Sequence, residues 1–174
     1  MNLAVGVRVA FVVFVVAILQ VSAFSAIEVG GGGPDVLLVT LVSVALLRGA
    51  VAGAAVGFAA GLIVDVTTLG TVGFTSLLLT LVGYWIGRYG ETTGRGRPHA
   101  PLVATVAATV LVVFGGYGLH AMLGEPVAAR TVLTALPASL LWNALLIYPV
   151  FGLVRRSIGT TERVERAQEV ELRV

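Results

Sequence analysis

Cysteine and lysine are both missing from this chain of 174 residues. Without cysteine the protein forms no disulfide, and it offers neither a thiolate nucleophile nor a thiolate ligand for a metal. Only 11% of the residues are charged, against about 25% in a typical soluble domain. All the basic residues are arginines, and they lie between hydrophobic runs rather than in one patch. This placement argues against nucleic-acid binding.

The chain also lacks the motifs from which an active site is recognised. It contains no nucleophile elbow, no phosphate-binding loop and no pair of histidines at the spacing of metal ligands. A metal held by His120 with Asp35 and Asp65 is one alternative, but a lone histidine near a membrane interface usually serves as a hydrogen-bonding group. We therefore predict no enzymatic activity, no metal and no cofactor.

Hydrophobic residues, by contrast, make up 57% of the chain, and the mean hydropathy is +1.01. This composition predicts an all-α polytopic membrane protein, because a chain in lipid must satisfy its backbone hydrogen bonds within helices. The first apolar run also has features of a signal peptide, with Arg8 before it and small residues after it. The later runs indicate a membrane protein in either case. The six predicted transmembrane helices are residues 9–24, 36–47, 49–65, 72–85, 102–123 and 131–153.

The second and third of these runs are separated only by Arg48 and Gly49. One helix from Val36 to Val66 would be about 46 Å long and would bury an arginine, which costs about 2.5–3.5 kcal/mol at the centre of a membrane helix. Two short helices joined by a tight turn avoid both problems. We predict two helices, with the Arg48 side chain reaching the membrane interface.

The third run has the most unusual composition. Glycine recurs every four residues at Gly49, Gly53, Gly57 and Gly61, and the next step of four reaches Asp65. Small residues allow neighbouring membrane helices to approach closely. We predict that this run is the central helix of the protein, in contact with several neighbours; the alternative is a generic span rich in alanine and glycine.

Arginine placement predicts the orientation, because loops on the cytoplasmic side carry an excess of arginine and lysine. With six spans, only Arg130 lies on the outer side, and both termini are cytoplasmic. We divide the chain into a six-helix transmembrane domain, residues 1–154, and a charged cytoplasmic tail, residues 155–174. The arginines predicted on the cytoplasmic side of the membrane are Arg8, Arg48, Arg88, Arg95, Arg97, Arg155 and Arg156.

Three polar residues interrupt or border the apolar runs. Asp35 follows Pro34 and is a candidate cap for the second helix. Asn143 lies near the middle of the sixth helix, where we expect it to form a hydrogen bond to another helix. Asp65 lies near the outer end of the third helix; two interpretations remain open, a functional charge within the membrane and a cap for the following turn.

The order and spacing of several segments resemble the MreD family of rod shape-determining membrane proteins. The resemblance covers residues 34–156, while the first helix and the tail agree only in character. The matching segments are Pro34-Asp35 before a leucine-valine run, Arg48-Gly49, residues 57–65, Gly73, Leu-Val-Gly-Tyr at 81–84, residues 142–146 and Arg155-Arg156.

The resemblance implies a multi-pass protein of the bacterial cytoplasmic (inner) membrane that acts as a non-enzymatic scaffold in cell-wall elongation. It would bind the single-span protein MreC and belong to an assembly with MreB, RodA and a class B penicillin-binding protein. The alternative is the substrate-binding membrane subunit of a small-solute, vitamin-type transporter, with a pocket near Asp35, Asp65 and His120. The residues predicted to serve partner binding or helix packing are Asp35, Arg48, Gly53, Gly57, Gly61, Asp65, Gly83 and Asn143.

Overall fold

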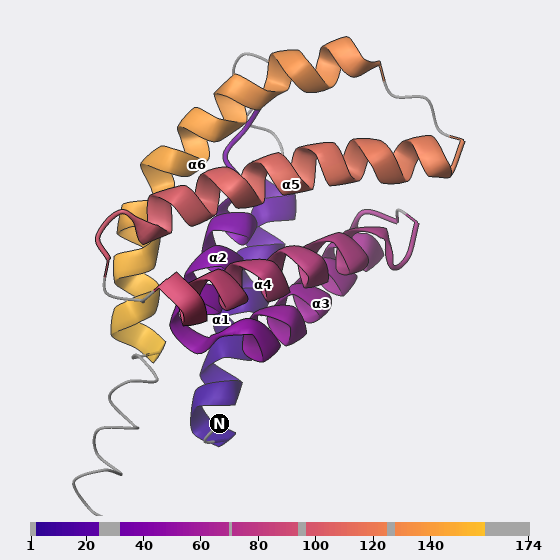
Figure 1. Cartoon of the computed structure of the whole chain (residues 1–174). Helices are drawn as coiled ribbons and strands as arrows, with labels where there is room; N and C mark the ends of the chain where they lie inside the picture. Colours follow the sequence, from indigo (N-terminus) through magenta and orange to yellow (C-terminus); the bar gives the residue numbers. More distant parts are fainter. Residues whose placement is uncertain (1–2, 25–31, 70, 94–96, 125–127, 159–174) are drawn as a thin grey trace, which may run out of the picture.

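The structure, a computed structural model, describes residues 3–24, 32–69, 71–93, 97–124 and 128–158. It confirms the all-α prediction (Figure 1). The elements are α1 (Leu3–Leu19) with a π-helical extension η1 (Gln20–Phe24), α2 (Val36–Arg48), α3 (Ala50–Thr67), α4 (Phe74–Thr93), α5 (Ala100–Met122) and α6 (Ala129–Ile158). The predicted loop at 27–33 and the charged tail lie largely outside the described residues.

Helices α3, α5 and α6 are long and apolar enough to cross a membrane. Helix α2 is apolar but has only 13 residues, which gives it a length of about 20 Å against a hydrocarbon thickness of about 30 Å. Helices α4 and α6 continue beyond their predicted ends, to Thr93 and Ile158. The described chain thus has six helices, and six crossings of the membrane remain a prediction.

Helix α2 lies at the centre of the molecule. Every residue from Leu37 to Leu47 is buried, and the helix contacts all five of the others. Helix α3 contacts α1, α2 and α4, as expected, but it leaves one face open, where Val51 is 83% exposed. The prediction that the glycine-rich run is the central helix is therefore wrong. Large aliphatic side chains fill the space around a central helix, whereas glycines bring α3 close to one neighbour.

The break between α2 and α3 lies where the sequence predicts it. Helix α2 ends at Arg48 and α3 begins at Ala50. Gly49 between them has φ 90° and ψ −176°, a conformation open to glycine and strained for any residue with a Cβ. One glycine therefore turns the chain between two helices that both pack in the same core.

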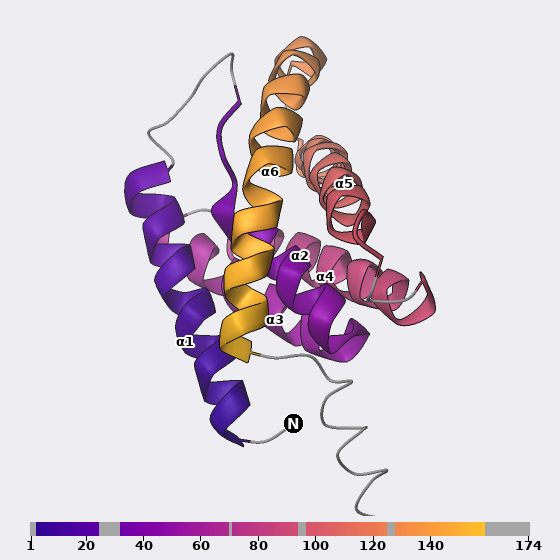
Figure 2. The same cartoon turned by 90° about the vertical axis from the view of Figure 1, so that its left-hand side faces the viewer.

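The helices form two sets that cross each other. Helices α3, α4 and α5 run alongside one another, while α1 and α6 run across them (Figures 1 and 2). Helix α6 contains Pro137 and Pro149 and changes direction along its length (Figure 1). Prolines inside a helix remove backbone hydrogen bonds and are a common cause of such bends. The crossing leaves α2 enclosed between the two sets.

Candidate functional site

The glycines of α3 face the backbone of α4. A Cβ placed on Gly53 or Gly57 would lie within 3 Å of the carbonyl oxygen of Gly83 or Leu79, respectively. At Gly61 a Cβ would meet the backbone of Ser76 equally closely. These contacts involve backbone atoms, so no side-chain rotation relieves them. We call this contact, formed by Gly53, Gly57 and Gly61 against α4, the glycine seam.

Asp65 closes one end of the glycine seam. Its side chain is buried, and its two oxygens accept hydrogen bonds from three backbone amides at the start of α4. The amides of Gly73 and Ser76 donate to Oδ2 at 2.8 and 3.3 Å, and the amide of Thr75 donates to Oδ1 at 3.0 Å. The first amides of a helix have no partner within it and carry partial positive charge. The geometry of Asp65 is that of a cap for α4.

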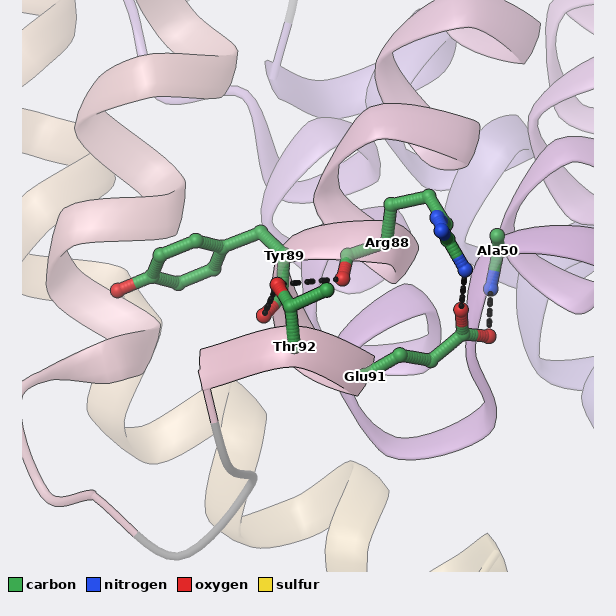
Figure 3. Close-up of polar contacts among 5 residues, drawn as sticks. All are labelled: Ala50, Arg88, Tyr89, Glu91 and Thr92. Carbon is green, nitrogen blue, oxygen red and sulfur yellow. Dashed lines mark hydrogen bonds and ion pairs between the residues drawn. The ribbon is translucent and has the colours of Figure 1, made fainter.

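Glu91 closes the other end in the same way (Figure 3). Its Oε1 accepts a hydrogen bond from the amide of Ala50, the first residue of α3, at 2.9 Å. Its Oε2 lies 3.3 Å from an Arg88 guanidinium nitrogen. Each helix of the pair therefore carries, near its C-terminal end, the carboxylate that caps the N-terminus of the other.

The sequence reasoning missed Glu91, although a signal for it exists. On α3 the spacing of four runs through glycines to Asp65, and on α4 the same spacing runs from Gly83 through Gly87 to Glu91. A Cβ on Gly87 would lie within 3 Å of the Ala50 backbone. Both helices thus use one pattern, small residues at the contact and then a carboxylate at the end of the same stripe.

A second polar cluster holds the start of α2. The Asp35 side chain accepts a hydrogen bond from the Leu38 amide at 2.8 Å, which confirms the predicted cap. Asn143 of α6 is buried; its Oδ1 accepts from the Asp35 amide at 2.9 Å, and its Nδ2 donates to Thr109 Oγ1 of α5 at 3.1 Å. The predicted hydrogen bond from Asn143 to another helix is confirmed.

Gln20 completes this cluster from α1. Its Nε2 donates to the carbonyl of Pro34 at 3.1 Å, and its Oε1 accepts from the amide of Val36 at 2.9 Å. The residue lies where the α-helical part of α1 gives way to the π-helical η1. Nothing in the apolar run around Gln20 marked it as a partner for the start of α2, because this contact depends on how α1 packs.

The predicted site residues therefore fall into separate groups. The four residues Gly53, Gly57, Gly61 and Gly83 lie together in the glycine seam, and Asp65 lies at its end. Asp35 and Asn143 belong to the cluster at the start of α2. Arg48 lies at the opposite end of α2 and is partly buried.

A cavity of about 560 Å³ lies beside the Asp65 end of the seam, between the α3–α4 turn and the end of α5. His120 lines this cavity, with its ring 4.5 Å from that of Phe74, but Asp35 does not. The set His120, Asp35 and Asp65 is therefore not assembled. Among the residues that the structure describes, no group of histidine, aspartate and glutamate side chains is placed to hold a metal.

The comparisons with known proteins identify a family. Residues 3–157 match the family model of the rod shape-determining protein MreD. No curated protein and no solved structure matches the chain. The family match includes α1, which the sequence resemblance covered only in general character. With helices able to cross a membrane and a match over most of its length, the chain belongs to the MreD family of rod shape-determining membrane proteins.

Proposed function

We propose that the protein is a non-enzymatic scaffold of the cell-wall elongation complex, where it binds an MreC-like single-span protein and helps to organise peptidoglycan synthesis. It resides in the bacterial cytoplasmic membrane and crosses it six times. The wider assembly includes MreB, RodA and a class B penicillin-binding protein. Family membership supports this proposal, and one structural observation carries it: three of the buried polar side chains, those of Asp65, Ser76 and Asn143, connect one helix to another.

That observation covers three helix contacts. Asp65 joins α3 to α4, and Asn143 joins α6 to both α5 and the start of α2. The hydroxyl of Ser76 on α4 donates to the carbonyl of Phe58 on α3 at 2.9 Å. Buried polar groups that already have partners stabilise one arrangement of helices. They leave little capacity for the proton transfers and nucleophilic attack of catalysis.

A single-span partner does not need to contact the glycine seam. Because α4 covers Gly53, Gly57 and Gly61, a second protein would have to displace α4 to reach them. The outward side chains of α3 and α4 are large and apolar, as at Phe58 and Trp85. A single-span partner would therefore meet the outer faces of this helix pair, whose shape the seam and its two caps maintain.

The cavity beside Asp65 supports the second candidate, a solute-binding subunit of a transporter. Its volume lies within the range of about 300–1,000 Å³ usual for small-molecule sites. The glycine seam is packed inside the protein rather than exposed, so it offers no direct contact surface to a scaffold partner. Membership of the MreD family favours the scaffold.

Affinity capture of the tagged protein from native membranes, followed by mass spectrometry, tests the scaffold function. We expect a single-span partner of the MreC type to be recovered. The variant Gly57→Leu should lose this partner, because it forces α3 and α4 apart, whereas Gly152→Leu is a matched control because no atom lies near a Cβ at Gly152. Recovery of an intact transporter ATPase instead of the single-span protein would contradict the proposal.

The orientation is tested with single cysteines in this naturally cysteine-free chain. Val72 and Thr92 are exposed near opposite ends of α4. If α4 crosses the membrane with the arginine-rich end inside, an impermeant thiol reagent added to intact cells should label Val72→Cys and not Thr92→Cys. Labelling of both would contradict the six-span topology. Gly32 is unsuitable as a labelling position, because a Cβ there would lie within 3 Å of α6.

A further inference from the structure

The cavity beside Asp65 has a lining that the scaffold function does not use. It lies where the α3–α4 turn approaches the C-terminal end of α5, at one end of the molecule (Figure 1). Its volume of about 560 Å³ lies in the middle of the usual range for small-molecule sites. The residues that line it are Asp65, Thr68, Leu69, Thr71, Phe74, Thr75 and His120.

The polar part of this lining consists mainly of uncharged hydroxyl groups. Thr71 and Thr75 each bring one hydroxyl, which can both donate and accept a hydrogen bond, while the Thr68 hydroxyl donates to the Val64 carbonyl at 2.8 Å and can only accept from a ligand. Among the lining residues that the structure describes, Asp65 is the acidic one, and its oxygens already accept three amides at the start of α4. Closely spaced neutral donors and acceptors suit a ligand that itself carries several hydroxyl or amide groups.

The apolar part of the lining includes an aromatic pair. The rings of Phe74 and His120 are 4.5 Å apart and inclined by 44°. An aromatic surface beside several hydroxyl groups matches a sugar ring, which has an apolar face of C–H groups and an edge of hydroxyl groups. In the described part of the lining the Asp65 carboxylate already has its hydrogen-bond partners, so this part of the lining favours a neutral saccharide over a highly charged ligand.

The lining of the cavity includes one strongly exposed apolar side chain. Leu69 is 92% exposed and has φ 53°. A bulky residue with positive φ is strained, and such strain is found preferentially at functional sites. An exposed leucine beside a polar cavity is expected where lipid tails lie next to the head-group layer. A ligand with acyl chains and a polar head would contact both surfaces.

We propose that this cavity binds a neutral saccharide, presented as the head group of a membrane glycolipid. The proposal goes beyond the scaffold function and does not depend on it. Free saccharide offers the same hydrogen-bonding groups without the acyl chains, so the test must separate these two sources.

The test uses the purified full-length protein in lipid nanodiscs and two probes. The first probe is soluble di-N-acetylchitobiose, followed by isothermal titration calorimetry. The second is a monoglucosyl diacylglycerol included in the nanodisc lipids, followed by the midpoint of thermal unfolding. Binding of the glycolipid alone assigns the site to a lipid-borne sugar, and binding of both shows that the saccharide is sufficient.

The double variant Thr71→Val/Thr75→Val removes two hydroxyls while keeping the shape of the lining and the Thr75 amide that donates to Asp65. We expect binding to weaken by about tenfold or more. Thr92→Val, at the far end of α4, is the matched control and should bind as the unmodified protein does. Because the double variant could unfold, Thr71→Val alone, at an exposed position, provides a second, milder test.

Absence of binding for both probes, or equal binding by a folded double variant, would overturn the proposal. Capture of the single-span partner by the same variant tests the scaffold function separately. Loss of saccharide binding with retained capture is the expected combination.

Discussion

Helices α2 and α3 are neighbours in sequence and in space, yet they pack by opposite means. Helix α2 is made of leucine and valine and is buried on every side. Half of the residues of helix α3 are glycine or alanine; the helix is buried along one stripe and exposes Val51, Phe58 and Val66 on the other side. The two helices share a glycine, Gly49, at their junction.

The difference shows what composition reveals in a membrane protein. Lipid tails are as apolar as leucine, so hydrophobicity alone does not select the helix that lies inside. Glycine positions instead indicate where the backbones of two helices come closest. In this protein that place is the pair α3–α4, while the centre is occupied by the helix whose side chains fill space in all directions.

The largest effect on stability is expected from a substitution in α2 that creates a cavity in the core. Leu41→Ala removes a fully buried side chain, and such substitutions lower the free energy of unfolding by about 2–5 kcal/mol. The matched control is Leu62→Ala on the open face of α3, where we expect little change. Thermal unfolding in detergent compares the two. Equal destabilisation would contradict the assignment of α2 as the buried central helix.

The break between α2 and α3 was predictable because two independent arguments, helix length and a buried arginine, gave the same answer. The identity of the central helix was not predictable from Leu37–Leu47 alone. An apolar run of that length reads equally well as a short span or a buried core helix. Only the packing of five other helices around it decides between them.

The second-largest effect is expected from adding a side chain inside the glycine seam. Gly57→Ala places a Cβ against the Leu79 carbonyl, and overpacking of this kind costs about 1–3 kcal/mol. Gly152→Ala on α6 has open space around it and should instead stabilise by up to about 1 kcal/mol, through helix propensity. The two thermal unfolding midpoints should therefore move in opposite directions. A shift of the same sign in both variants would contradict the close backbone contact at Gly57.

The candidate site was predictable where a residue acts locally. Asp35 lies one residue before α2 begins, so its role as a cap follows from sequence position. Asn143 was predictable as a partner for another helix, but its partners Asp35 and Thr109 were not. Glu91 and Gln20 were missed because each forms hydrogen bonds with a segment that is distant in sequence. Only the fold brings these segments together.

The third effect tests the buried end of the seam. Asp65→Asn keeps one acceptor oxygen but replaces the other with an amino group, which faces backbone amides that also donate. We expect destabilisation of about 1–3 kcal/mol, with a parallel fall in membrane abundance. Asp65→Leu removes both acceptors and should be worse. Normal abundance of Asp65→Asn together with failed rod-shape complementation would instead identify a functional charge.

The smallest effect is expected at the exposed end of the seam, and it shows whether the two caps are equivalent. Glu91 caps α3 by accepting a hydrogen bond from the Ala50 amide, and its side chain remains 34% accessible, so water can replace much of the lost hydrogen bonding. Glu91→Gln keeps an oxygen for the Ala50 amide but removes the charge near Arg88. We expect a loss of about 0.5–1 kcal/mol, which falls further in high salt because exposed charges are screened. Thermal unfolding of Glu91→Gln and Asp65→Asn at low and high salt measures both caps together. A larger effect at Glu91 than at Asp65 would mean that the arginine-rich end, rather than the buried end, holds the helix pair together.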